Sequence, residues 1–542
     1  MKSITLIALN AKYCHTSLSI RSIGIVCQEK GIPVFYLEHS INESYRDIIK
    51  SILRQESDVY AFSCYLWNIE LIEKLCIDLK QVKPKCKIML GGPEVSYDPQ
   101  EYPFADVIIC SEGENAVTEY LLGIKSDRII QGSPILFMDD LPFCYSDDDL
   151  IANKGRLIYY ESSRGCPFSC SYCLSSIEKG VRYKSVSKVC EELKRFDNAK
   201  VELVKFVDRT FNANKKRAME IWKFAAEKCQ YTKFHFELSG ELLDEEAFSY
   251  LKTVPKGKFQ FEIGVQSTYE PTLKAVDRKG NLNHLFENIR KLTKMGNIHI
   301  HTDLIVGMPL ETYEIFQKSF CDLYSLKSDC IQIGFLKLLK GSKIRNEAEE
   351  YKYHYSSFAP YEIYDNEFIT SEEVFRLEQI AETVERYYNS HAFEKSIAYV
   401  IDKFETPFHF YERLSEKFDQ RGAISQKNLY AVFYDFFIEN FGESKIFSEW
   451  LKFDWLKQTK DSTLPDYLGK NEFLQPVLFQ LLEENQFKHD YIPEISHLKN
   501  KEIVKKCFIA KFNFEKEYIF LFYQGNVFDI TKEYNNLNER NL

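Results

Sequence analysis

Short apolar strands alternate with amphipathic helices in the first part of this chain, and this alternation restricts the possible fold more than any other feature. Helical stretches such as 17–30 and 69–81 separate five strand-like segments, which are 4–9, 34–37, 59–62, 87–90 and 107–110. The pattern predicts an α/β domain over residues 1–140, with an open, doubly wound (Rossmann-like) parallel sheet. Ligands of such sheets bind beyond the carboxyl ends of the strands.

The same alternation resumes after a predicted linker at residues 141–155. Six further strands are expected between residues 156 and 350, at 156–161, 205–207, 233–237, 258–264, 298–306 and 330–336. They predict a second parallel sheet, with its site at the strand carboxyl ends. The linker carries Asp147, Asp148 and Asp149, a run typical of a solvated connection. Residues 351–542 read as a mostly helical domain with a short β element at 508–522, and Thr370 with Glu373 predicts a capping box.

Three cysteines follow the first strand of this second sheet at close spacing. Cys166, Cys170 and Cys173 form a C-x3-C-x2-C run after an Arg164-Gly165 turn. A structural zinc site needs four protein ligands, so zinc would require a distant fourth residue. Three thiolates on one short loop suit a 4Fe–4S cluster that leaves one iron open to a substrate or cofactor.

This loop resembles that of the radical S-adenosylmethionine (radical SAM) superfamily, including the aromatic Tyr172 before the last cysteine. The resemblance implies a partial (β/α)6 barrel of the TIM type, a 4Fe–4S cluster on the three cysteines and SAM at the barrel mouth. It also implies that residues after the second barrel strand meet the methionine end of SAM. Asp208-Arg209-Thr210 stands there in place of the family's usual Gly-Gly-Glu, which puts the contact by Asp208 in doubt.

Polar residues also end the later strands of the predicted barrel. The resemblance implies that Gln266 and Ser267 face the ribose of SAM and that the turn at Gly307 packs near the adenine. Arg278 could fork onto the SAM carboxylate, or could form a surface salt bridge instead. Glu237 and Asp303 complete the set of predicted SAM-binding residues in this domain.

The strand ends of the first domain carry a second set of candidate ligand-binding residues. They are Asn10; Ser63 and Tyr65; Gly91, Gly92 and Glu94; and Glu112, Gly113 and Glu114. No G-x-G-x-x-G follows the first strand, which argues against a dinucleotide. Gly-Gly-Pro-Glu followed by Glu-Gly-Glu resembles the cobalamin-binding domain that precedes many radical SAM domains, although each alone could be an ordinary βα turn.

Histidines give no clear metal site. The D-x-H-x-x-G motif by which mutases and methionine synthase bind cobalt is absent, so the resemblance implies cobalamin without a protein histidine ligand and His15 as a residue of the cofactor rim. His299 and His301 share one face of a strand. A pair without a third ligand is more often barrel lining or a substrate contact than a metal site.

The composition and charge of the chain limit its possible partners and its cellular location. The chain has 542 residues, 45% of them hydrophobic, and a net charge of −10, which disfavours a general nucleic-acid-binding surface. No early apolar run is long enough to predict a membrane span or signal peptide. A cytoplasmic protein is expected, because reduced thiols suit an iron–sulfur site.

The two cofactors together imply an enzyme that cleaves SAM reductively and methylates an unactivated carbon or phosphorus. The expected partners are a small-molecule or peptide substrate and an electron donor such as flavodoxin or ferredoxin. The open alternatives are a cobalamin-dependent rearrangement or oxidative cyclisation, a non-catalytic cobalamin or redox sensor, and a tRNA-modifying enzyme, which the absence of a basic tail disfavours.

Overall fold

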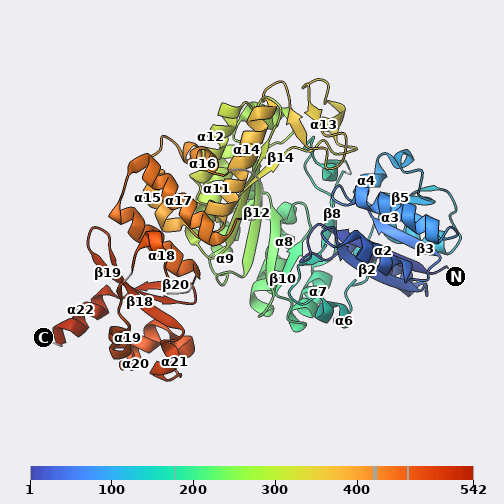
Figure 1. Ribbon diagram of the computed structural model, residues 1–542. Coiled ribbons are helices and arrows are strands. Elements are labelled where there is room, and N and C mark those ends of the chain that lie inside the picture. The colour runs from blue at the N-terminus through green and yellow to red at the C-terminus, as the bar shows by residue number, and fades with distance from the viewer. Residues whose placement is uncertain (1, 178, 419–423, 460–462, 471, 541–542) are drawn as a thin grey trace. The chain divides into compact units, whose positions relative to one another are not determined.

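A computed structural model describes residues 2–177, 179–418, 424–459, 463–470 and 472–540. The chain forms two compact units, Met1–Val374 and Phe375–Leu542. The first unit holds both predicted parallel sheets, in the blue-to-yellow part of Figure 1. Within the described ranges, no helix combines the length and the apolar character needed to cross a bilayer.

The first sheet has six parallel strands in the order β2-β1-β3-β4-β5-β6. Five were predicted, with ends within a few residues; the three-residue β6 was missed. The strands are β1 Ile4–Asn10, β2 Val34–Ser40, β3 Val59–Ser63, β4 Lys87–Gly91, β5 Val107–Cys110 and β6 Ile129–Gln131, and the helices are α1 Leu18–Glu29, α2 Tyr45–Leu53, α3 Ile69–Val82, α4 Pro93–Ser96 and α5 Gly113–Leu121.

Both faces of this sheet are covered, as a doubly wound fold requires. One apolar cluster joins one face to α2 and α3 through residues such as Ile48 and Ile72, and a second joins the other face to α1 and α5 through Ile20 and Val117. The chain order reverses between β1 and β3, so the connections leave these strands in opposite directions. This switch point opens a crevice at the carboxyl ends of the strands.

The second sheet also has six parallel strands, in the order β14-β13-β12-β11-β10-β7, which confirms the predicted set. The strands are β7 Ile158–Tyr160, β10 Leu203–Phe206, β11 Lys233–Leu238, β12 Phe259–Gln266, β13 His299–Val306 and β14 Cys330–Phe335, and the helices are α7 Val186–Asn198, α8 Lys215–Lys228, α9 Glu245–Leu251, α10 Glu270–Ala275, α11 Leu282–Met295 and α12 Tyr313–Tyr324.

The two faces of this second sheet differ sharply. Alternate residues form a fully buried apolar face that includes Phe206, Phe236 and Phe261. The residues between them are polar and only partly buried; they are Lys205, Glu237, Gln260, Glu262, His299, His301 and Asp303. A polar face on central strands points to a ligand-binding surface, because a core face would be apolar.

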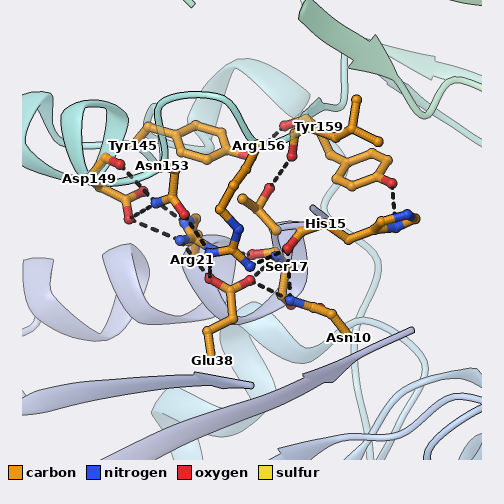
Figure 2. A network of polar contacts seen from close by, with 12 residues as sticks. Asn10, His15, Ser17, Arg21, Glu38, Tyr145, Asp149, Asn153, Arg156 and Tyr159 are labelled. Carbon is orange, nitrogen blue, oxygen red and sulfur yellow. Dashed lines mark hydrogen bonds and ion pairs between the residues drawn. The ribbon is translucent and has the colours of Figure 1, made fainter. Parts of the chain in front are cut away.

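The predicted linker is solvated only in part: Asp147 and Asp148 are exposed, as their acidic run suggested, whereas Asp149 is half-buried and pairs with the first domain. Residues Asp147–Ala152 form the helix α6, capped by Ser146. Arg21 of α1, which is buried, donates Nε–H to Asp149 over 2.7 Å and also pairs with Glu38 over 2.9 Å. Figure 2 shows this guanidinium between the two carboxylates. A buried arginine needs such partners, so the linker is fastened to the first domain.

Beyond the second sheet, the first unit continues to Val374. This stretch holds α13 Lys343–Asn346, β15 His354–Tyr355 and β16 Ile363–Asp365. Tyr353 and Asn366 both donate hydrogen bonds to the carbonyl oxygen of Gly307, over 2.8 and 3.0 Å. The domain boundaries proposed at residues 140, 155 and 350 stay predictions.

The second unit is largely helical, as predicted, with a four-stranded antiparallel sheet in the order β17-β18-β19-β20. The predicted capping box is present, since Thr370 and Glu373 bond reciprocally at the start of α14. The elements are α14 Ser371–Val384, α15 Glu394–Ile401, α16 Pro407–Ser415, α17 Gln426–Phe441, α18 Lys445–Thr459, β17 Glu472–Phe473, α19 Gln475–Leu481, α20 Asn485–Tyr491, α21 Asn500–Ile503, β18 Cys507–Asn513, β19 Glu517–Tyr523, β20 Asn526–Asp529 and α22 Thr531–Arg540.

Candidate functional site

The three-cysteine loop is enclosed by a small antiparallel hairpin. Its strands are β8 Ser163–Arg164 and β9 Arg182–Tyr183. Gly165 has a φ of +95°, and a Cβ atom there would lie 2.2 Å from the carbonyl oxygen of Gly180. Only glycine permits both this backbone conformation and this close approach, so Gly165 lets the chain enter the cysteine loop.

The cysteines keep their thiols near polar partners. Cys170 is buried, whereas Cys166 and Cys173 are half-buried, and the Sγ atom of Cys166 lies 3.5 Å from the Oγ1 atom of Thr210. The hydroxyl of Ser176 bonds to the carbonyl oxygens of Cys170 and Cys173, which holds the loop in a tight turn. Three soft thiol donors on one turn are the donor set that a 4Fe–4S cluster takes.

A cluster spreads its ligands over different iron atoms. Among the described residues, no three His, Cys, Asp or Glu side chains form a group that could hold a metal ion. Thiolates that bind separate corners of a 4Fe–4S cluster lie further apart than the ligands of one ion, so this finding does not count against the cluster.

Arg278 lies beside the cysteine loop and is half-buried, and its predicted contact with the SAM carboxylate stays a prediction. Its guanidinium donates to the carbonyl oxygen of Gly264 and interacts with Cys170, Tyr172 and Asp303. Burial raises the pKa of Cys170, and the charge of Arg278 and a hydrogen bond with Tyr172 oppose that rise. Arg278 is therefore placed to supply positive charge next to the cluster thiolates.

A bulge at the end of β12 directs Gln266 toward Asp303. The register between β12 and β13 shifts between Gly264 and Gln266, and Gln266 has a φ of +72°. Its amide donates to Asp303 over 3.2 Å, while its buried Oε1 atom has no partner among the described residues. Burial raises the pKa of Asp303 to about 6. Bulges of this kind often re-aim side chains beside active sites.

Glu237 and Glu262 face one another across β11 and β12 with opposite ionisation. Burial and the neighbouring charge of Glu262 raise the pKa of Glu237 to about 7. A hydrogen bond from His235 and the charge of Lys205 hold the pKa of Glu262 at about 2. The pair can thus present one neutral carboxyl and one carboxylate near neutral pH.

Three predicted SAM-binding residues make other contacts in the structure. Asp208 is fully buried and accepts hydrogen bonds from Ser162 and Ser163. Ser267 is also fully buried and donates to Glu311 over 2.5 Å. A Cβ atom on Gly307 would lie 1.8 Å from Ile363. These contacts favour positioning roles over direct contact with a ligand.

A pocket of about 590 Å³ lies at the carboxyl ends of the first sheet. Its size is typical of a small-molecule site. Eight of the nine predicted cofactor-binding residues of this domain line it, and they are Asn10, Ser63, Tyr65, Gly91, Gly92, Glu112, Gly113 and Glu114. Gly92 has a φ of +118°, and its Cα packs against the backbone of Cys64, so these strand ends pass close together.

Glu94 is the exception, since it does not line the pocket. Its buried carboxylate accepts a hydrogen bond from Tyr361 over 2.5 Å and lies 3.4 Å from the Nζ atom of Lys340. Both partners come from the chain after the second sheet. Glu94 therefore fastens the first sheet to that segment, which a reading of strand ends alone did not reveal.

The second sheet supplies the far wall of the same pocket. Tyr159, Glu161, Arg164, Val207 and Arg209 line it from the ends of β7 and β10 and the hairpin between them. His15 lies on the rim, as predicted, where its Nδ1 atom is 2.9 Å from the hydroxyl of Tyr159; Figure 2 shows this pair. One cavity is thus bounded by strand ends of both domains.

Sequence reasoning missed several lining residues. Ser17, Ser19 and Ser22 reach the pocket from α1, and Tyr159 and Arg209 reach it from the second sheet. No local motif marks these positions, because only the packing of the two sheets brings them to the cavity. Trp67, which stacks on Tyr65 with ring centroids 4.4 Å apart, lies in the polar strand-end run that the sequence did single out.

His299 and His301 are placed on the polar face of the second sheet, as predicted from their spacing. The Nε2 atom of His301 lies 2.7 Å from the side-chain amide nitrogen of Gln260, and His299 lies 3.8 Å from Asp329. Burial and the neighbouring His299 lower the pKa of His301 to about 4. These contacts favour the interpretation of barrel lining.

The sequence matches three protein families along its length. Residues 4–121 match the B12 binding domain, residues 160–322 the radical SAM superfamily, and residues 349–522 a protein family of unknown function (DUF4080). The first two matches cover the two sheets whose strand ends bound the pocket.

Curated relatives are distant. The chain is 27% identical over 309 residues to the 2-(S-pantetheinyl)-carbapenam-3-carboxylate methyltransferase of Streptantibioticus cattleyicolor and 28% identical over 310 residues to the cobalamin-dependent radical SAM methyltransferase TokK of Streptomyces tokunonensis. Each alignment covers 48% of this chain and 44% of the relative, so the chain spans less than half the length of these proteins.

Two solved structures share the fold of this chain at low sequence identity. The cobalamin-dependent radical SAM enzyme OxsB, with aqua-cobalamin and S-adenosylmethionine bound, superimposes with a TM-score of 0.59 at 13% identity over 85% of this chain and 79% of its own. The radical SAM methyltransferase TsrM of Kitasatospora setae, with cobalamin and a 4Fe–4S cluster bound, gives 0.55 at 12% identity, over 65% and 78%. These likenesses show the fold.

Fold, pocket and family matches agree. The first sheet is a B12-binding domain, the cysteine loop opens a radical SAM domain, and the cofactors are cobalamin, a 4Fe–4S cluster and SAM. The chain thus carries a B12-binding domain, a radical SAM domain and a C-terminal DUF4080 region, and it is similar to cobalamin-dependent radical SAM enzymes.

Proposed function

We propose that this enzyme methylates an unactivated carbon, or a phosphorus, of a small-molecule or peptide substrate. One observation carries the proposal: a single pocket is bounded by the strand ends of both the B12-binding and the radical SAM domains. When bound, the cofactors supply one-electron cleavage of SAM and a transferable methyl group. A pocket shared by both domains favours methyl transfer, since donor and acceptor must meet.

The chain itself supplies binding and orientation in this proposal. Cys166, Cys170 and Cys173 hold the cluster, and Arg278 with Tyr172 borders it. Gln266, Asp303 and Glu237 line the polar strand ends where SAM would lie. Asp208, Ser267 and Gly307 hold the loops around it in place.

In this proposal cobalamin binds to the wall of the pocket that the first sheet forms. The residues that would contact it are Asn10, Ser63, Tyr65, Gly91, Gly92 and the segment from Glu112 to Glu114. Four of these eight residues are small (Ser63, Gly91, Gly92 and Gly113), which leaves room for a bulky ring. Apart from His15, no histidine lines the pocket among the described residues. The bond between His15 and Tyr159 supports a rim position for this imidazole rather than a cobalt ligand.

The relatives support methyl transfer without identifying the substrate. Most of the curated proteins similar to this chain are methyltransferases, and they act on substrates as different as a carbapenam and hopanoids. We propose a diffusible one-electron donor, such as flavodoxin or ferredoxin, as the reductant that the radical SAM family implies.

The two products formed from SAM, 5′-deoxyadenosine and S-adenosylhomocysteine, test the proposal. Anaerobic protein carrying both cofactors is incubated with SAM and a strong reductant, and 5′-deoxyadenosine and S-adenosylhomocysteine are measured. Methyl transfer predicts both products, and neither from a Cys166→Ala variant. Deoxyadenosine without S-adenosylhomocysteine, even after cobalamin is reduced, would favour a rearrangement or cyclisation instead.

A further inference from the structure

Both strands of the hairpin around the cysteine loop are ion-paired to the B12-binding domain. Arg164 on β8 contacts Glu112 over 2.9 Å and Glu114 over 2.5 Å. Arg182 on β9 pairs with the other oxygen of Glu112 and donates to the carbonyl oxygen of Ile135 over 2.6 Å. Glu112 of the B12-binding domain therefore binds both strands of the hairpin that encloses the cysteine loop in the radical SAM domain.

This hairpin depends on those carboxylates. Arg164 and Arg182 are directly opposite one another in the register of β8 and β9. Like charges facing each other across a strand pair destabilise it. Glu161 of the radical SAM domain adds a contact of 2.8 Å to Arg164, and Glu112 bonds to both guanidinium groups, so joining the two domains further offsets the repulsion.

The ion pairs are shielded from water. The side chains of Arg164, Glu112 and Glu114 are only 13%, 12% and 5% exposed. The amide of Ile135 donates to Glu112 over 2.7 Å, and Ser22 of α1 donates to Glu114 over 2.9 Å, so both carboxylates are held on the side of the B12-binding domain as well. Removing one partner of such a pair is costly, because the other charge stays buried.

The same residues face the ligand. Glu112, Gly113, Glu114 and Arg164 all line the shared pocket, and Arg164 is two residues from Cys166. A ligand that packs against the loop from Glu112 to Glu114 must affect the energy of the hairpin that encloses the cysteines. By linkage, the cysteine loop must affect ligand binding to the same extent.

We propose that Glu112 and Glu114, through Arg164 and Arg182, are positioning residues that couple cobalamin binding to the 4Fe–4S loop. The bond network makes each site more stable when the other is filled. This inference does not depend on methyl transfer, and it concerns two equilibria that can be measured without a substrate.

The test compares cobalamin affinity in the full-length protein before and after cluster reconstitution. Hydroxocobalamin is the probe, and its dissociation constant is measured anaerobically by ultrafiltration. We expect the cluster to tighten binding by about five- to tenfold, within the usual range of coupling between sites. In Glu112→Gln and in Arg182→Gln this ratio is expected to fall below twofold.

A reciprocal readout and a control separate coupling from simple damage. Bound hydroxocobalamin should slow the loss of iron to a chelator in the wild type, but not in Glu112→Gln. Glu43→Gln, which removes a carboxylate bonded to His39 outside the pocket, should keep the wild-type ratio. If Glu112→Gln does not fold, Arg182→Gln decides, since it removes the positive charge that Glu112 binds and leaves Glu112 in place.

Two results would overturn the proposal. One is a wild-type affinity ratio below threefold, which would mean that the sites are independent. The other is a ratio in Arg182→Gln equal to that of the wild type, which would mean that the coupling runs through other contacts.

Discussion

At the scale of single residues, the candidate site was predictable where chemistry follows a strand end. Asn10, Ser63, Gly91 and Glu112 were named from their positions after apolar strands, and all of them line the pocket. Glu94 was named by the same rule but pairs with Lys340, far along the chain. A sequence pattern gives the edge of a sheet on which a residue lies, whereas the partner that captures its side chain depends on tertiary packing.

The three cysteines give the sharpest residue-scale prediction. Substituting any of Cys166, Cys170 or Cys173 by Ala should remove a thiolate ligand and abolish the visible absorbance of the reconstituted cluster. Cys190→Ser, on α7, is the matched control and should retain it, because Cys190 lies outside the loop. A wild-type spectrum in all three alanine variants would contradict the assignment of the cluster.

Glu237 gives a prediction for pH dependence. Its pKa is raised in the fold to about 7 from an ordinary value of 4.5, so the folded cofactor-free protein binds this proton more tightly than the unfolded chain does. Stability is therefore lost as pH rises from about 4.5 through 7, by at most about 3 kcal/mol.

Glu237→Gln removes the loss of folding stability that ionisation of Glu237 causes at higher pH. The thermal midpoint of the cofactor-free variant should rise relative to wild type between pH 5 and pH 8, as followed by calorimetry. Glu43→Gln, whose pKa is lowered in the fold, should show no such gain. A difference between Glu237→Gln and wild type that does not change with pH would show that Glu237 is ionised in the fold.

At the scale of elements, both sheets were predicted closely because buried strands carry continuous or alternating apolar patterns. All five predicted strands of the first sheet and all six of the second are present. β6 was missed since only three residues form it, and β8 and β9 were missed since two residues each cannot show a period. Yet this short hairpin encloses the cysteine loop, and its two strands pair across the 17 residues that hold the three cysteines.

Two glycines of this hairpin offer a matched pair of substitutions. Gly165 and Gly180 both have positive φ, +95° and +92°, but an added Cβ meets a backbone oxygen only at Gly165. Gly165→Ala should add a steric clash to the backbone strain that Gly180→Ala shares, which is of order 1–3 kcal/mol. We expect Gly165→Ala to lose most of its iron after reconstitution and Gly180→Ala to keep it, as measured by iron analysis. Equal iron content would show that the close approach at Gly165 does not matter.

At the scale of the whole molecule, the order of the domains was readable from the sequence, whereas their joining was not. Nothing in the local pattern around Asp149 indicated that it pairs with Arg21, whereas Asp147 and Asp148 of the same run are exposed, as predicted. Nor did any motif show that Glu112 would hold Arg164 and Arg182. Contacts between distant segments decide how strand ends of both domains come to bound one cavity.

The linker provides a test at this scale. Asp149→Asn leaves the buried guanidinium of Arg21 with only Glu38 as a charged partner, so the joint between α6 and α1 should weaken by about 1–3 kcal/mol. Hydrogen exchange in α6 should become faster than in wild type. Asp147→Asn, whose side chain is 87% exposed, is the control and should leave the exchange unchanged. Faster exchange in both variants would mean that α6 responds to its own charge rather than to Arg21.

The central claim is that one chain brings cobalamin and a SAM-binding cluster to a single pocket. The most direct measurement is anaerobic purification with cobalamin supplied, followed by iron, sulfide and cobalt analysis of each chain. The account predicts about four iron, about four sulfide and about one cobalt per chain. Iron and sulfide without cobalt, or cobalt bound equally well when Gly92 is replaced by a bulky residue at the pocket wall, would contradict it.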